Sequence, residues 1–202
     1  MKKILSLLAI PVLAGILAFR PANDPLPIGA ALPQPEVKMK DVSGKEISFA
    51  DARKKNGLLA MFSCNTCPVV GKYQSRTLEI ARYAISNNIG VILLNSNEAS
   101  RSDGESMADM QDYAQQQGYD FSYVLDPSSN MADLFGATRT PELFLFNKDN
   151  TLVYHGAIDD NANDAAKVTR QHAREAINEL VSGKDISTKK TRSVGCTIKR
   201  LN

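Results

Sequence analysis

The chain has 202 residues, of which 43% are hydrophobic and 23% charged, a composition typical of a globular protein with its own core. The net charge is +2, and removing the three positive charges of Lys2, Lys3 and Arg20 at the N-terminus leaves −1. That balance excludes a general electrostatic attraction to nucleic acid or anionic lipid.

Residues 1–20 have the pattern of an export signal. Lys2 and Lys3 give a positive start, and sixteen uncharged, mostly apolar residues follow from Ile4 to Phe19. That run includes Pro11 and is shorter than a membrane span, which needs about 20 residues. We expect an exported protein, periplasmic or otherwise extracytoplasmic, with an uncleaved N-terminal anchor as the alternative. Either route leads to an oxidising compartment, where cysteine pairs exchange or form structural disulfides.

Composition divides the remaining chain into three parts. Residues 21–35 contain five of the nine prolines, which predicts an extended, proline-rich linker. Residues 36–183 carry the periodic patterns of a single globular domain. Residues 184–202 form a basic C-terminal tail that contains Cys196 and almost no apolar run. A loosely held, solvated segment and a binding patch explain that tail about equally well.

Periodicity predicts the elements of the domain. Apolar and polar residues alternate over 36–49 around Ser43-Gly44, which indicates a β-hairpin, and a short helical turn follows at 50–56. Apolar runs predict strands at 58–62, 90–95, 121–125, 142–146 and 151–154, and helical periodicity predicts helices at 68–87, 105–117, 129–135 and 165–182. This order favours an α/β fold in which one mixed sheet has helices on both faces.

Cys64 and Cys67 stand where the strand at 58–62 ends and the helix at 68–87 begins. A helix N-terminus carries partial positive charge and stabilises a thiolate over a thiol. The C-x-x-C spacing also brings two sulfur atoms close enough to bond without a large movement of the backbone. We therefore predict a redox-active cysteine pair at this junction.

Two other interpretations compete with redox activity. A structural disulfide between these cysteines would close a very small loop and constrain the unfolded chain little. A metal site would need two further ligands, but His155, His172 and Cys196 show no paired spacing. We therefore expect no metal and no cofactor.

Thr140-Pro141 forms the second candidate element, directly before the strand at 142–146. A threonine–proline bond at the start of a strand can be cis. Such a turn beside the cysteines would present a backbone edge to a partner polypeptide, so Thr140 and Pro141 are predicted to shape a substrate groove. The alternative is an ordinary loop proline.

Seven short stretches of the sequence, taken in order, are similar to the motifs of a known family. They are Cys64-Asn65-Thr66-Cys67-Pro68-Val69-Val70, Asn95-Ser96-Asn97, Glu105-Ser106-Met107, Gly136-Ala137, Thr140-Pro141-Glu142, Tyr154-His155-Gly156-Ala157-Ile158-Asp159-Asp160 and Gly195-Cys196-Thr197-Ile198-Lys199. From about residue 28 to residue 199 the chain resembles exported, peroxiredoxin-like redoxins of the alkyl hydroperoxide reductase and thiol-specific antioxidant superfamily. The resemblance implies a thioredoxin-like fold, with a central mixed β-sheet flanked by helices and an N-terminal β-hairpin extension.

The resemblance implies two activities that assign the cysteines differently. In thioredoxin-like exchange, Cys64 is the exposed nucleophile and Cys67 resolves the mixed disulfide. In peroxiredoxins a threonine usually stands three residues before the peroxidatic cysteine. Here Cys64 occupies that position and Cys67-Pro68 matches the peroxidatic pair. Peroxide would then oxidise Cys67 to a sulfenic acid, and Cys64 or Cys196 would resolve it.

Three further residues are candidates for auxiliary roles. Arg76, just over two turns along the helix from Cys67, would bind an anionic or peroxide substrate, or would be a solvated helix residue. Glu98 would relay a proton for Cys67, or would be a surface carboxylate. Cys196 would exchange with the active pair if the tail folds back, or bond another chain; the alternative is an incidental thiol.

The sequence therefore predicts an enzyme, an exported thiol–disulfide oxidoreductase with an antioxidant or redox role. A thiol peroxidase acting through Cys67 is the alternative within enzymes. A non-catalytic binding module with a structural disulfide is the alternative from another class. The expected partners are protein thiols and disulfides or small hydroperoxides, together with an upstream reductant. No nucleic acid is expected, and a membrane only through an N-terminal anchor.

Overall fold

The computed structural model describes residues 24–201. The predicted export signal at 1–20 therefore lies outside the described residues. Among the helices of this described range, none has the length and apolar character needed to cross a membrane.

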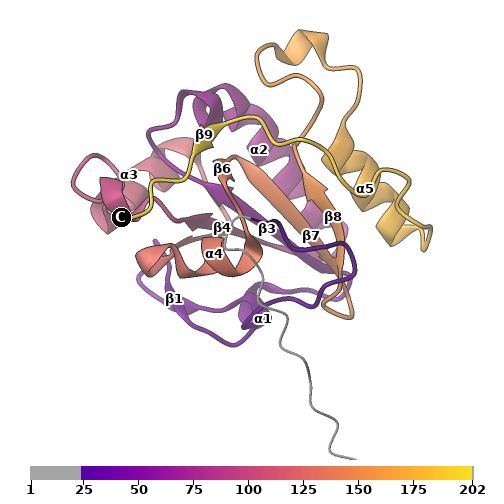
Figure 1. The fold of residues 1–202 in the computed structure, drawn as a ribbon, viewed down its shortest axis with the longest axis horizontal. Coiled ribbons are helices and arrows are strands. Elements are labelled where there is room, and N and C mark those ends of the chain that lie inside the picture. Colours follow the sequence, from indigo (N-terminus) through magenta and orange to yellow (C-terminus); the bar gives the residue numbers. More distant parts are fainter. Residues whose placement is uncertain (1–23, 202) are drawn as a thin grey trace, which may run out of the picture.

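Five strands form a central mixed sheet in the order β5-β4-β3-β7-β8 (Figure 1). β3 (Gly57–Ser63), β4 (Ile89–Asn95) and β5 (Ser122–Leu125) run parallel, β7 (Glu142–Asn147) is antiparallel to β3, and β8 (Leu152–Gly156) is antiparallel to β7. Every residue of β3 and β4 is buried, as expected for central strands covered on both faces. The predicted α/β thioredoxin-like fold is confirmed.

Helices cover both faces of the sheet and define two cores. Tyr73 and Ile80 of α2 (Pro68–Ser86) pack with buried residues of α3 (Met107–Gln117) and α5 (His172–Val181) against Leu59 and Met61 of β3. On the other face, α1 (Phe49–Ala52) and α4 (Asn130–Phe135) pack against Leu58, Ala60 and Phe62. The strand alternates between the two cores, because successive side chains point to opposite faces of a sheet. The helix predicted at 165–182 is divided into a 3-10 turn, η3 (Ala165–Lys167), and α5.

The described part of the expected linker belongs to the domain. Leu26 and Leu32 are buried in the core that contains α1 and α4. The Leu26 amide donates to the Phe135 carbonyl at 2.9 Å, and Ala31 pairs with Thr151. The linker prediction is therefore wrong over residues 24–35, since a proline-rich extended segment can also pack along a surface. The hairpin that follows is confirmed, with β1 (Met39–Lys40) antiparallel to β2 (Glu46–Ile47).

The basic C-terminal tail is also part of the fold. Figure 1 shows it running from α5 past β6 (Arg139–Thr140), with which β9 (Cys196–Thr197) pairs antiparallel. Ile186 and Ile198 are buried, with 6% and 3% of their surfaces exposed. The interpretation of a loosely held, solvated tail is therefore wrong, because these apolar side chains, the β6–β9 pair and backbone hydrogen bonds, such as the one from the Thr191 amide to the His155 carbonyl, hold it on the domain.

Candidate functional site

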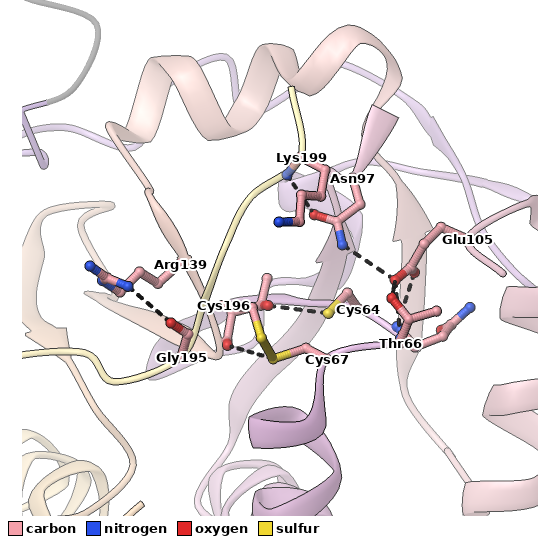
Figure 2. Close-up of a disulfide and its surroundings, with 11 residues drawn as sticks. Cys64, Thr66, Cys67, Asn97, Glu105, Arg139, Gly195, Cys196 and Lys199 are labelled. Carbon is pink, nitrogen blue, oxygen red and sulfur yellow. Dashed lines mark hydrogen bonds between the residues drawn. A yellow bond between two sulfur atoms is a disulfide. The ribbon is translucent and has the colours of Figure 1, made fainter. Parts of the chain in front are cut away.

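A disulfide joins Cys67 to Cys196, which lies 129 residues later in the sequence, and their Cα atoms are 6.0 Å apart (Figure 2). Cys67 is the N-cap residue of α2, and Cys196 begins β9. Cys64 remains a free thiol. The tail therefore folds back onto the C-x-x-C segment, and the bond involves the tail cysteine instead of the two closely spaced cysteines.

Local sequence explains how Cys67 reaches this position. The buried strand β3 ends at Ser63, and Pro68 starts α2, where its fixed φ angle suits the first helical residue and its missing N–H is not needed. The Cys67 side chain makes no capping hydrogen bond. Its sulfur therefore lies at a helix N-terminus, where the partial positive charge stabilises the thiolate released when the disulfide is reduced.

Cys64 is fully buried and does not match its predicted role as the exposed nucleophile. Its Sγ lies 3.1 Å from the Thr140 hydroxyl oxygen. Burial raises the pKa of the Cys64 thiol to about 11, and the hydrogen bond with Thr140 offsets only part of that effect. In this disulfide form Cys64 is therefore a protonated internal thiol.

The raised pKa of Cys64 predicts a loss of stability in alkaline solution. The unfolded chain releases this proton near pH 9 and the folded chain near pH 11, so the unfolded state binds fewer protons in that window. The contribution of the Cys64 thiol to the free energy of unfolding is therefore complete below pH 9. It falls as the pH rises, by up to about 2–3 kcal/mol. Urea denaturation at pH 8 and pH 11 should show a loss both in this protein and in a Cys64→Ser variant, because burial also raises the pKa of Tyr73, Tyr119, Tyr123 and Tyr154. The loss in the variant should be smaller by the amount that Cys64 contributes. Equal losses in both proteins would contradict the assignment.

Thr140 lies at the centre of the three cysteines. Its peptide bond to Pro141 is cis, as predicted. Its hydroxyl contacts Cys64, its carbonyl oxygen lies 3.5 Å from Cys67 Sγ, and its backbone pairs with Cys196. A Cβ atom on Gly195 would lie 1.9 Å from this same carbonyl oxygen, so the close approach of the tail requires glycine there. The predicted backbone edge exists, and this chain's own tail occupies it.

Glu105 lies in one of the stretches that carry the family resemblance, but the sequence predicted no role for it at the site. Its carboxylate is fully buried and accepts hydrogen bonds from the Asn65 backbone amide and the Asn95 side-chain amide. It also accepts from the Thr66 amide and hydroxyl and from the Asn97 side-chain amide (Figure 2). Asn97 in turn accepts a hydrogen bond from the Lys199 amide at 3.0 Å. One carboxylate therefore links the C-x-x-C loop, through Asn97, to the tail.

A Glu105→Gln substitution is expected to destabilise the protein by about 2–4 kcal/mol, because an amide NH₂ group would face N–H donors on at least one side. Urea denaturation of the oxidised protein measures the effect. Glu98→Gln is a matched control, since that partly exposed carboxylate contacts Arg101 at 3.3 Å and the Ser128 amide. The control should lose no more than about 1 kcal/mol. Equal losses would contradict a special role for Glu105.

Two of the three predicted auxiliary residues, Arg76 and Glu98, have charged partners other than the cysteines. Arg76 pairs with Asp159 at 2.6 Å and lies over the Tyr73 ring at 4.0 Å. Glu98 pairs with Arg101, whose guanidinium also donates to Asn95 at the end of β4. The structure therefore gives no support to substrate binding by Arg76 or proton relay by Glu98. In the described residues no group of three or more His, Cys, Asp or Glu side chains is arranged to hold a metal ion.

A thioredoxin-like sheet with a cysteine at the N-terminus of the helix after β3, facing a cis-proline turn, defines a thiol-dependent redox protein. The sequence model of the AhpC/TSA family matches residues 28–155, and the chain belongs to that family. The matched range contains Cys64, Cys67, Thr140 and Pro141 and ends before Cys196. Family membership supports a redox function.

Solved structures share the fold. A hypothetical protein SMc02350 from Sinorhizobium meliloti 1021 is 28% identical with a TM-score of 0.79, covering 88% of this chain and 97% of its own. An uncharacterized conserved protein from Geobacillus kaustophilus is 29% identical with a TM-score of 0.80, covering 87% and 93%. Peroxidoxin BcpB from Mycobacterium tuberculosis is 11% identical with a TM-score of 0.52, covering 77% and 94%, which shows the fold alone. The comparison with curated proteins found no match.

Proposed function

We propose that this chain is a thiol–disulfide oxidoreductase whose oxidised form carries the Cys67–Cys196 disulfide. One observation carries the proposal: the bond joins a helix N-cap residue to a strand that pairs with Thr140, directly before the cis-proline. A helix N-terminus favours the thiolate and so makes Cys67 a good nucleophile and a good leaving group.

In the proposed cycle the reduced Cys67 thiolate attacks a sulfur of a partner's disulfide. One partner sulfur leaves as a thiolate, and the other forms a mixed disulfide with Cys67. The Cys196 thiolate then attacks Cys67 Sγ, which releases the second partner thiol and forms the Cys67–Cys196 bond. The partner's disulfide has been reduced to two thiols, and this protein has been oxidised. Cys67 is the attacking cysteine in this cycle, whereas the resemblance to thioredoxin-like exchange implied that role for Cys64.

Thiol peroxidase activity is a second candidate, favoured by the AhpC/TSA match and by the use of Cys67 in the disulfide. The Cys67 thiolate would attack one peroxide oxygen, hydroxide would leave, and Cys196 would condense with the sulfenic acid to give the disulfide and water. The position three residues before Cys67, where peroxiredoxins usually have threonine, is Cys64. A buried, protonated thiol is a poorer hydrogen-bond donor to peroxide than a threonine hydroxyl.

One experiment separates these functions. The reduced Cys64→Ser variant is mixed with a disulfide-containing peptide or with stoichiometric hydrogen peroxide, and its thiols and disulfides are then titrated and mapped by mass spectrometry. Exchange predicts that the peptide disulfide regenerates the Cys67–Cys196 bond. Peroxidase activity predicts a trappable sulfenic acid at Cys67 when Cys196 is also replaced by serine. Resistance to both reagents would leave only a structural disulfide.

We also propose that the protein acts outside the cytoplasm, on protein disulfides and with a separate upstream reductant. Support comes from the positive start and apolar run of residues 1–20 and from a disulfide at the proposed reactive site. Fractionation of expressing cells, with mass measurement of the mature N-terminus, tests this location. Recovery of the full-length chain in the cytoplasm with all thiols reduced would overturn it.

A further inference from the structure

A pocket of about 430 Å³ lies between the tail and the end of the sheet that carries the cis-proline. We call it the tail pocket, and its lining residues are Thr138, Arg139, Glu142, His155, Lys190, Thr191, Arg192 and Ser193. The tail is fixed beside it, because the Thr191 amide donates to the His155 carbonyl and the Ile198 amide to the Thr138 carbonyl, both at 3.0 Å. The pocket exists only because the tail is docked.

The rim of the tail pocket is positively charged. Arg139, Lys190 and Arg192 are exposed. Glu142 is the one carboxylate of the lining, and its oxygens already have hydrogen-bond partners within the protein. It accepts hydrogen bonds from the Thr138 and Arg139 amides and lies 2.6 Å from His155 Nε2. The charge offered to solvent is therefore that of the three cations, which attracts an anion.

Two buried polar atoms of the lining have no hydrogen-bond partner among the described residues. They are His155 Nδ1 and Ser193 Oγ, in residues with 4% and 9% of their surfaces exposed. A buried polar atom without a hydrogen-bond partner is destabilising, so a ligand that bonds both atoms would be favoured. A protonated imidazole donates from both nitrogens, which would let His155 bind Glu142 through Nε2 and an anion through Nδ1.

The tail pocket adjoins the disulfide. Ser193 precedes Cys196 by three residues, a span of at most about 10 Å. Arg139 is next to Thr140, which pairs with Cys196, and its guanidinium donates to the Gly195 carbonyl at 3.0 Å (Figure 2). Cys67 is only 5% exposed, whereas Cys196 is partly exposed. Cys196 is therefore the more accessible of the two bonded cysteines for an incoming thiolate.

We propose that the tail pocket binds the carboxylate of a small anionic thiol and directs that thiol to Cys196. The inference rests on the proposed function. The bound thiolate attacks Cys196 Sγ, and Cys67 leaves as a thiolate at the helix N-terminus. A second thiol molecule then attacks the mixed disulfide, releasing Cys196. Two small thiols become one disulfide, and the protein gains two thiols.

Reduction rates of the full-length oxidised chain test this selectivity. The reagents are 3-mercaptopropionate, which carries a carboxylate, and 2-mercaptoethanol, which is neutral, at equal thiolate concentrations and low salt. A Lys190→Gln/Arg192→Gln variant should react roughly three- to tenfold more slowly with 3-mercaptopropionate, whose reacting form carries two negative charges, and should lose clearly less with 2-mercaptoethanol, whose thiolate carries one. Lys54→Gln/Lys55→Gln is the matched control, since both residues are exposed and neither lines the pocket. Equal losses with both reagents, or none with either, would overturn the proposal.

A second measurement does not depend on redox activity. Succinate, which has carboxylates but no thiol, is titrated into the oxidised chain while the His155 imidazole signals are followed by NMR. Saturable shifts that weaken in the Lys190→Gln/Arg192→Gln variant are expected. Their absence would overturn the pocket even if the disulfide exchanges, whereas their presence with an unreactive disulfide would overturn only the proposed function.

Discussion

Cys67→Ser is expected to reduce all thiol–disulfide exchange to the uncatalysed background. Cys67 is the cysteine at the N-terminus of α2 and the one bonded to Cys196. The two cysteines that remain cannot replace it, because Cys64 is fully buried with a pKa raised to about 11 and Cys196 lies at no helix N-terminus. Steady-state reduction of a disulfide-containing peptide, with disulfide mapping of each variant, measures the effect.

Cys64→Ser is the matched control for that experiment. It removes a thiol from the same loop but leaves the Cys67–Cys196 bond intact, so most of the activity should survive. Retention by Cys64→Ser and loss by Cys67→Ser would place the reactive sulfur at the helix N-terminus. The opposite result would restore the assignment implied by the resemblance to thioredoxin-like exchange, in which Cys64 attacks the partner.

Reduction of the Cys67–Cys196 disulfide is expected to lower the free energy of unfolding by about 3–5 kcal/mol. The bond links residues separated by 129 positions, and closing a loop of that length removes much entropy from the unfolded chain. For a domain of this size the loss corresponds to a fall in Tm of about 10 °C. Urea denaturation of the Cys64→Ser variant, with and without reductant, measures it with no other thiol able to exchange.

The noncovalent contacts on either side of Cys196 determine whether the tail stays bound when the disulfide is reduced. Thr191 bonds to the backbone of Ala157 and Ile198 is buried, so the tail has noncovalent anchors on both sides of the disulfide. A Cys64→Ser/Cys196→Ser variant should therefore remain folded and match the reduced Cys64→Ser protein in stability. A difference of less than about 1 kcal/mol between the oxidised and reduced proteins would contradict the loop-entropy argument.

The features predictable from the sequence were those with a local signal. Apolar runs identified β3 and β4, and a proline at the start of a strand identified the cis turn at Thr140-Pro141. The buried role of Glu105 had no such signal, because its donors come from Asn65, Thr66, Asn95 and Asn97, which meet only in three dimensions.

The burial of apolar residues in the tail could not be predicted from the sequence for the same reason. Ile186 and Ile198 are too far apart to form a periodic pattern, yet both are buried. Sequence analysis recognised Cys196 as a candidate partner of the cysteine pair but could not choose its bond. The disulfide that forms depends on the register of β9 against β6, in which Thr140 lies opposite Cys196. The register between segments so far apart in the sequence is fixed only in the folded chain.

The separation of Cys67 and Cys196 also bears on how the chain acquires its bond during synthesis. Cys67 emerges 129 residues before Cys196, and Cys64 three residues earlier still, at a stage when β6 has not been made. Oxidation in that interval can join only the two early cysteines, within one chain, and domains form from the N-terminal side as they are synthesised. The Cys67–Cys196 bond requires β6, Gly195 and the buried Ile198 all to be in place. The Cys67–Cys196 bond therefore forms only in chains whose last strand, β9, has already paired with β6.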